Sequence, residues 1–139
     1  MTFKSSIPNN DIRKLEQLWS IYKYEVLSKS HKDYLTIREL LKNKTHPPTH
    51  KIIEIIQKSL QLPESKKDAV NGANHIWGYF KKEVSKEEKQ KYKKLIEEYQ
   101  KNRIPYRDIQ AFLWQLLEQY PNSYLMNSSY FNSVRETKS

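Results

Sequence analysis

Apolar side chains follow one another at helical spacing along most of this chain. The first segment sets the pattern, with steps of four, three and four residues between Leu15, Trp19, Tyr22 and Val26. This spacing places all four on one face of a helix. The run from Ile52 to Leu60 is rich in β-branched residues and also suits a buried strand, but no partner strand is evident elsewhere. The pattern therefore predicts an all-α fold.

Capping and helix-breaking residues divide this pattern into six or seven segments. Asn9, Asn10 or Asp11 can cap a first helix that runs to Ser28. Further helices are expected over residues 30–41, 52–60, about 65–83, 85–101, 106–120 and, briefly, from 121. Prolines in the 45–50 loop and at positions 105 and 121 separate these segments.

The length of 139 residues suits one domain with a core of its own. We expect a single compact bundle of about six or seven helices over residues 9–131, with tails at 1–8 and 132–139. Trp114 lies off the apolar face of its helix, and we expect it to cover the C-terminal segment rather than form an exposed stacking platform.

The segment of residues 71–82 is unusual because, as a helix, it would carry two opposed stripes. The core stripe would contain Val70, Ala73, Trp77 and Phe80, with Ile76 at its edge. The opposite stripe would contain Asn71, His75, Gly78 and Lys82, with Tyr79 beside them. A glycine inside a helix costs roughly 1 kcal/mol relative to alanine, which suggests that the polar stripe has a role. Alternatively, Asn71 and His75 bond the backbone of a neighbouring helix, and Gly78 permits a tight helix crossing.

The net charge of +9 indicates an anionic partner. Nucleic acid is the commonest such partner, while acidic proteins and anionic lipid surfaces are alternatives. Lysine-rich coding in an AT-rich genome would explain the same charge without any function. Between Lys29 and Lys44 only Asp33 and Glu39 offset the cations, so this stretch is a candidate phosphate-binding patch. A solvated surface is the alternative for this patch.

Several classes of function are excluded or left without support. The chain has no cysteine, hence no disulfide framework and no thiolate metal site. No apolar run approaches the roughly 20 residues needed to cross a bilayer, and the first residues lack the apolar segment of a signal peptide. We therefore expect a cytoplasmic protein with no membrane partner and no metal or other cofactor.

A set of short motifs occurs in a distinctive order. In the second half of the chain they are Asn71 and His75, Gly78-Tyr79-Phe80-Lys81, Ser85 with Glu88-Lys89, Ile104-Pro105, and Tyr120-Pro121 with Tyr124-Leu125. Near the start they are Trp19, Tyr22-Lys23, Ser30-His31 and Tyr34. In combination, over residues 15–131, they resemble the YbgA-like family of small all-helical domains. The chain departs from that family's pattern at Ala69, Tyr106 and Ser128, and Ala69 replaces a frequent histidine.

The resemblance implies a role connected with RNA. Similar domains are fused to a desulfidase domain that removes sulfur from 4-thiouridine in tRNA, where a cysteine-ligated iron–sulfur cluster performs the chemistry. A chain without cysteine cannot carry that cluster. The resemblance therefore implies a tRNA-binding module without a cofactor, which assists a separate desulfidase or another tRNA-acting protein.

For this role we expect two groups of side chains. Phosphate contacts are assigned to Lys23, Lys29, His31, Lys32, Arg38, Lys81 and Lys82. Discriminating contacts are assigned to Asn71, His75 and Tyr79, with Gly78 allowing close approach of the ligand. The mixed charges of residues 86–101 alternate in sign at helical spacing and are expected to form a solvated face.

Two other functions stay open at this point. A small enzyme acting on a nucleotide or modified base could use His75 and Tyr79 as acid–base residues, although no known catalytic motif is present. A basic interaction subunit could bind an acidic protein. His46 and His50 lack neighbouring carboxylates, so we expect no metal site there.

Overall fold

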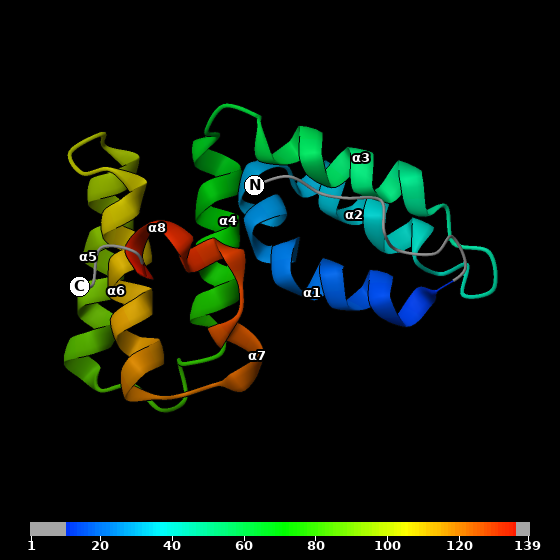
Figure 1. Ribbon diagram of the computed structural model, residues 1–139. Helices are drawn as coiled ribbons and strands as arrows, with labels where there is room; N and C mark the ends of the chain where they lie inside the picture. Colours follow the sequence, from blue (N-terminus) through cyan, green and yellow to red (C-terminus); the bar gives the residue numbers. More distant parts are fainter. Residues whose placement is uncertain (1–10, 136–139) are drawn as a thin grey trace.

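The computed structural model describes residues 11–135, and within this range every regular element is helical (Figure 1). The elements are α1 (Ile12–Lys29), α2 (His31–Leu40), α3 (Thr49–Leu60), α4 (Lys66–Trp77), α5 (Lys86–Gln100), α6 (Tyr106–Gln119), α7 (Ser123–Met126), the 3-10 helix η1 (Ser129–Phe131) and α8 (Asn132–Arg135). The all-α prediction is confirmed. The expected tail at residues 1–8 lies outside the described residues.

Side-chain caps begin five of the helices where polar residues predicted them. Asp11, Ser30 and Ser65 each accept a hydrogen bond from the backbone N–H three residues later. Ser85 and Glu88 form the reciprocal capping box at the start of α5, and Asn122 caps α7. These caps satisfy N–H groups that a helix leaves free, so local sequence determines where the helices begin.

Helix α1 is buried on two sides, because it belongs to two apolar cores. Leu15, Trp19 and Val26 pack with α2 and α3. Tyr24 and Leu27 pack instead into the larger core formed by α4, α5, α6 and the C-terminal segment. Figure 1 shows α4 standing between the α1–α3 group and the α5–α6 pair. The arrangement makes α1 and α4 the central pair of the fold.

Helices α1 and α4 approach each other closely at Gly72 of α4 and Ser28 of α1. A Cβ atom at position 72 would lie 2.7 Å from Ser28 Cβ and 2.9 Å from its Cα, distances that no side chain tolerates. Gly72 is buried, and its missing side chain lets the two backbones approach. The tight crossing considered for Gly78 is therefore made by Gly72, since Gly78 is exposed at the end of α4.

Helix α4 ends at Trp77, six residues before the predicted boundary near Glu83. Gly78 caps it, and hydrogen bonds from Tyr79 to Ile76 and from Phe80 to Trp77 form tight turns instead of continuing the helix. Phe80 is 1% exposed, so burial of this ring draws the chain inward. The predicted polar stripe is thus interrupted, because residues beyond Trp77 do not keep helical spacing.

The C-terminal segment is more ordered than its polar sequence indicates. Residues 132–135, expected in the tail, form α8, and Val134 is buried. Trp114 packs against Phe131 with ring centroids 5.4 Å apart, and the Arg135 guanidinium lies 5.1 Å from the Trp114 ring. Trp114 therefore covers the C-terminal segment, as expected.

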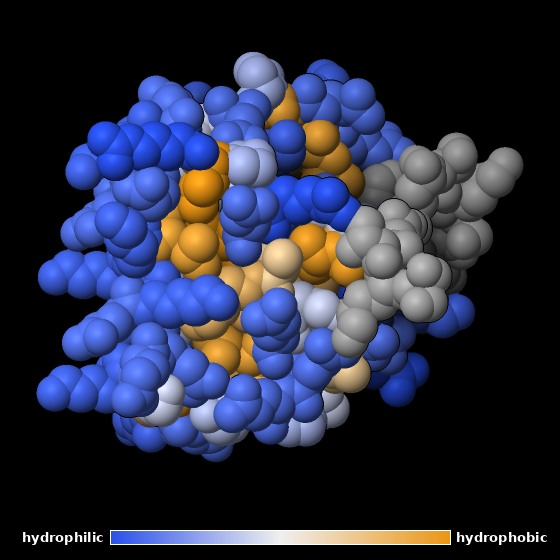
Figure 2. Space-filling model, turned by 90° about the vertical axis from the view of Figure 1, so that its left-hand side faces the viewer, coloured by the Kyte–Doolittle hydropathy of each residue, from blue (hydrophilic) through white to orange (hydrophobic). Residues whose placement is uncertain are grey.

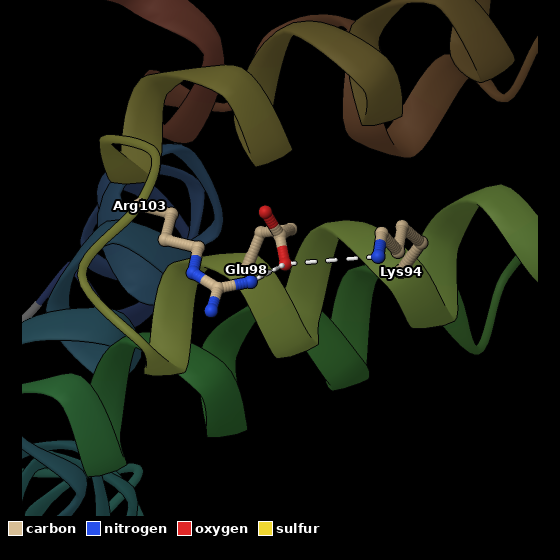
Figure 3. A network of polar contacts seen from close by, with 3 residues as sticks. All are labelled: Lys94, Glu98 and Arg103. Atoms are coloured by element: carbon tan, nitrogen blue, oxygen red, sulfur yellow. Dashed lines mark hydrogen bonds and ion pairs between the residues drawn. The ribbon is translucent and has the colours of Figure 1, made fainter.

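Helix α5 carries a mixed-charge face whose ions pair with each other. Glu98 lies between Arg103 and Lys94, at 3.2 Å and 3.8 Å (Figure 3). Hydrophilic side chains dominate this side of the molecule, with a band of apolar atoms visible between them (Figure 2). Exposed pairs of this kind contribute little stability, about 0–1 kcal/mol each.

Within residues 11–135, no helix is both long and apolar enough to span a bilayer.

The helix crossing predicts unequal effects of alanine at the two glycines. Gly72→Ala should lower the free energy of unfolding by about 1–3 kcal/mol, because the new methyl group forces α1 and α4 apart. Gly78→Ala, with a helical φ of −55° and contacts only to carbonyl oxygens of its own helix, should change it by less than about 1 kcal/mol. Urea unfolding of both variants measures the difference. Equal effects would contradict the assignment of the crossing to Gly72.

Candidate nucleic-acid interface

Three tyrosines form a cluster where α1, the end of α4 and α7 meet. The ring centroids are 6.0 Å apart for Tyr24 and Tyr79, and 6.5 Å apart for Tyr124 and each of the other two. Tyr79 and Tyr124 lie nearly parallel, at 23°, and Tyr24 stands at 87° and 86° to them. Tyr24 is 6% exposed, whereas Tyr79 and Tyr124 are 38% and 43% exposed. The cluster is therefore a buried floor with two parallel rings that reach solvent.

The floor ring is fixed by a hydrogen bond between the Tyr24 and Tyr79 hydroxyl groups. Burial raises the pKa of Tyr24 above its ordinary value, and the hydrogen bond to Tyr79 raises it further. The Tyr24 hydroxyl therefore stays protonated. The bond links α1 to the turn that follows α4. It therefore positions Tyr79 although that residue lies beyond the helix.

Lys23 supplies a cation to the same cluster. Its Nζ lies 5.2 Å from the centroid of Tyr24 and 5.0 Å from that of Tyr124, within the range of cation–π attraction. Lys23 is half-buried. The ammonium group is thus placed beside two aromatic rings.

His75 and His31 add imidazole groups at this location. Burial lowers the pKa of His75, and the nearby His31 and Lys23 lower it further. Both groups are therefore near enough to His75 to affect its pKa. His75 is nevertheless exposed, so an anion could reach it and relieve the repulsion. We name the surface of Lys23, His31, His75, Tyr79 and Tyr124 the tyrosine–histidine surface.

Some of the other predicted phosphate contacts also have contacts within the fold. The Lys29 Nζ donates to the Leu62 carbonyl at 2.9 Å, which gives this lysine a structural contact. The Arg38 guanidinium lies 5.8 Å from the Tyr34 ring, and that ring lies near His31, with centroids 6.4 Å apart. Among the predicted phosphate contacts, the exposed lysines and arginines without a described ion pair are Lys32, Arg38, Lys81 and Lys82.

Two members of the predicted polar stripe do not join the surface in the expected way. The Asn71 side-chain nitrogen is buried, with no hydrogen-bond partner among the described residues. Gly78 is exposed and ends α4 rather than lying within it. Gly78 and Lys82 are also exposed, but His75 and Tyr79 are the stripe residues that belong to the tyrosine–histidine surface.

Sequence reasoning missed Tyr24 and Tyr124. Tyr24 looked like one of many core tyrosines, and only the fold reveals its contact with Tyr79, 55 residues away. The sequence did draw attention to Tyr124, because this residue belongs to the motif of Tyr120-Pro121 and Tyr124-Leu125 described above.

The site offers little for acid–base or metal chemistry. His31 and Lys23 both lower the pKa of His75, and no described ion pair joins its imidazole to a carboxylate. Within residues 11–135, no group of three or more histidine, aspartate or glutamate side chains is placed to bind a metal. The arrangement is instead suited to binding an anion that also has flat aromatic groups.

A separate cavity of about 320 Å³ lies between α1, α4 and α6. Residues of both charges line it, including Glu25, Lys29, Glu64 and Arg107. Most of these groups have partners within the fold. Tyr99 donates to Glu64 at 2.5 Å, and Arg107 donates to the Ser133 carbonyl at 3.4 Å. We therefore assign this cavity no role in binding an anion.

The depressed pKa of His75 predicts a measurable titration. In the free protein the imidazole should titrate below 6.5, and Lys23→Gln should raise its pKa by removing a nearby positive charge. Because the folded state favours the neutral form, this residue makes stability fall as the pH drops from 6.5 through the folded pKa. NMR titration of the imidazole carbons measures the value. Lys51→Gln, at an exposed site on α3, is the control, and an unchanged pKa in Lys23→Gln would contradict the arrangement.

Comparison with known proteins identifies a family and no function. The sequence profile of DUF1722, described as a protein family of unknown function, matches residues 23–134. No curated protein and no solved structure matches the chain. The match includes the entire tyrosine–histidine surface and covers most of the chain. The chain therefore belongs to DUF1722, a family of proteins of unknown function.

Proposed function

We propose that this chain is a non-catalytic RNA-binding module that binds tRNA through the tyrosine–histidine surface. The observation that carries the proposal is the grouping of exposed Tyr79 and Tyr124 rings with Lys23, His31 and His75. Proteins bind single-stranded segments of RNA by combining aromatic rings, which stack on bases, with cations, which neutralise phosphates.

Charge supports an anionic ligand of this kind. The net charge is +9, and the acidic Glu98 of α5 pairs with Lys94 and Arg103. Lys23 contacts aromatic rings, and within residues 11–135 no ion pair joins it to a carboxylate. A phosphate bound there would also favour protonation of His75.

The choice of tRNA, and of a desulfidase as partner, comes from the resemblance to YbgA-like domains. In that scheme this chain holds the tRNA, which could be thiolated, while a separate protein performs the chemistry. The absence of cysteine means that the iron–sulfur cluster would have to belong to that other protein. Catalysis by His75 receives no support, because no described carboxylate orients it.

Filter binding of tRNA across a salt series tests the proposal, with duplex DNA of equal length as competitor. We expect the logarithm of the tRNA affinity to fall linearly with the logarithm of salt concentration. Lys23→Gln should weaken binding and reduce the magnitude of that slope by about 0.7–0.9, as expected for the loss of one phosphate contact. Lys94→Gln, on the paired face of α5, should bind like the wild type.

The contribution of stacking is tested separately. Tyr79→Ala should weaken tRNA binding by about 1–3 kcal/mol, whereas Tyr79→Phe keeps the ring and should lose less. Thermal unfolding of each variant checks that the fold survives. Binding that is absent or independent of salt would overturn the proposal, and a nuclease-resistant protein partner recovered in its place would favour an interaction subunit.

A further inference from the structure

A second hollow lies against the tyrosine–histidine surface, between α1 and the C-terminal segment. Its volume is about 500 Å³, within the range typical of small-molecule sites. Its lining residues are Gln17, Ser20 and Ile21 from α1, and Ser123, Tyr124 and Asn127 from α7 and its end. We name it the α1–α7 pocket.

The side chains that line the α1–α7 pocket are uncharged, and they combine polar groups with apolar surface. Gln17 and Asn127 carry carboxamides, each of which offers donors and an acceptor, and Ser20 and Ser123 carry hydroxyl groups. The Ser20 hydroxyl donates to the backbone carbonyl of Gln17 at 2.7 Å, and the hydroxyl oxygen of Ser20 can still accept a hydrogen bond. Tyr124 and Ile21 supply the apolar contacts. Such a set suits a neutral, flat group with hydrogen-bonding edges, and nucleobases are groups of this kind.

Tyr124 connects the α1–α7 pocket to the cationic surface. The ring lines the pocket, and the Lys23 Nζ lies 5.0 Å from its centroid. Tyr124 is 43% exposed, so the ring has area left for a ligand. A nucleotide whose base stacks on Tyr124 would therefore have an ammonium group close at hand for its phosphate.

We infer that the α1–α7 pocket binds one unstacked base of a single-stranded RNA segment. The carboxamides of Gln17 and Asn127 hydrogen-bond the base edge, Tyr124 stacks on its face, and Lys23 neutralises the adjoining phosphate. This inference rests on the proposed function and adds to it a place where the base itself is recognised. Recognition of a base requires an unpaired segment, because bases inside an RNA helix present their faces to each other.

Fluorescence anisotropy with short labelled oligonucleotides tests the inference. The probes are ten-residue oligo(U), oligo(A) and oligo(C), and an abasic oligomer of the same length. Wild-type protein should bind at least one of the three base-containing oligomers about five- to 100-fold more tightly than the abasic one. The double variant Gln17→Leu/Asn127→Leu should lose most of this difference, while the salt dependence of binding stays unchanged because no charge has been removed.

Control variants separate the pocket from the fold and from the cationic surface. Gln57→Leu, an equivalent change at an exposed site on α3, should bind like the wild type. Tyr124→Phe should keep the preference for bases, and Tyr124→Ala should lose it. Circular dichroism and thermal unfolding verify that each variant remains folded.

The outcomes distinguish the two levels of the proposal. If the double variant keeps the wild-type preference for bases while Lys23→Gln still weakens binding, the pocket inference is wrong and the proposed function stands. If the wild type binds the abasic oligomer as tightly as the others, recognition of a base is excluded as well. If the wild type binds no oligomer and no tRNA, the proposed function fails and the inference falls with it.

Discussion

Ser28 and Gly72 bring α1 and α4 closer together than any side chain at position 72 would permit. From this contact towards its C-terminal end, α4 follows α1 back to Tyr24, whose hydroxyl meets that of Tyr79. The position of the tyrosine–histidine surface thus depends on a buried glycine that lies outside that surface.

The surface also depends on where α4 stops. If α4 had continued past Trp77, Tyr79 would lie one turn beyond His75 on the same face of the helix. Instead the chain turns after Gly78, and the burial of Phe80 fixes that turn from the inside. Tyr79 is then held against Tyr24 on the outside, 6.0 Å between ring centroids. An apolar contact in the core and an aromatic contact at the surface therefore stabilise the same turn.

Local patterns in the sequence predicted most of the fold and only part of the candidate site. Capping residues such as Ser85 and Asn122 act within their own segments, so their effect can be inferred from neighbouring residues. The role of Gly72 could not, because it depends on Ser28, which is 44 residues earlier in the chain. The same holds for Tyr124, whose neighbours Lys23 and Tyr24 come from α1. The contact of Lys29 with the Leu62 carbonyl is likewise visible only in the folded chain.

NMR spectroscopy of ¹⁵N-labelled protein during titration with tRNA is the decisive test of RNA binding at the tyrosine–histidine surface, because it locates the ligand without altering a residue. We expect saturable shifts of the backbone amides around Lys23, His75, Tyr79 and Tyr124, with the amides of α5 unaffected. Shifts centred on α5, or no shifts at saturating tRNA, would contradict binding at this surface.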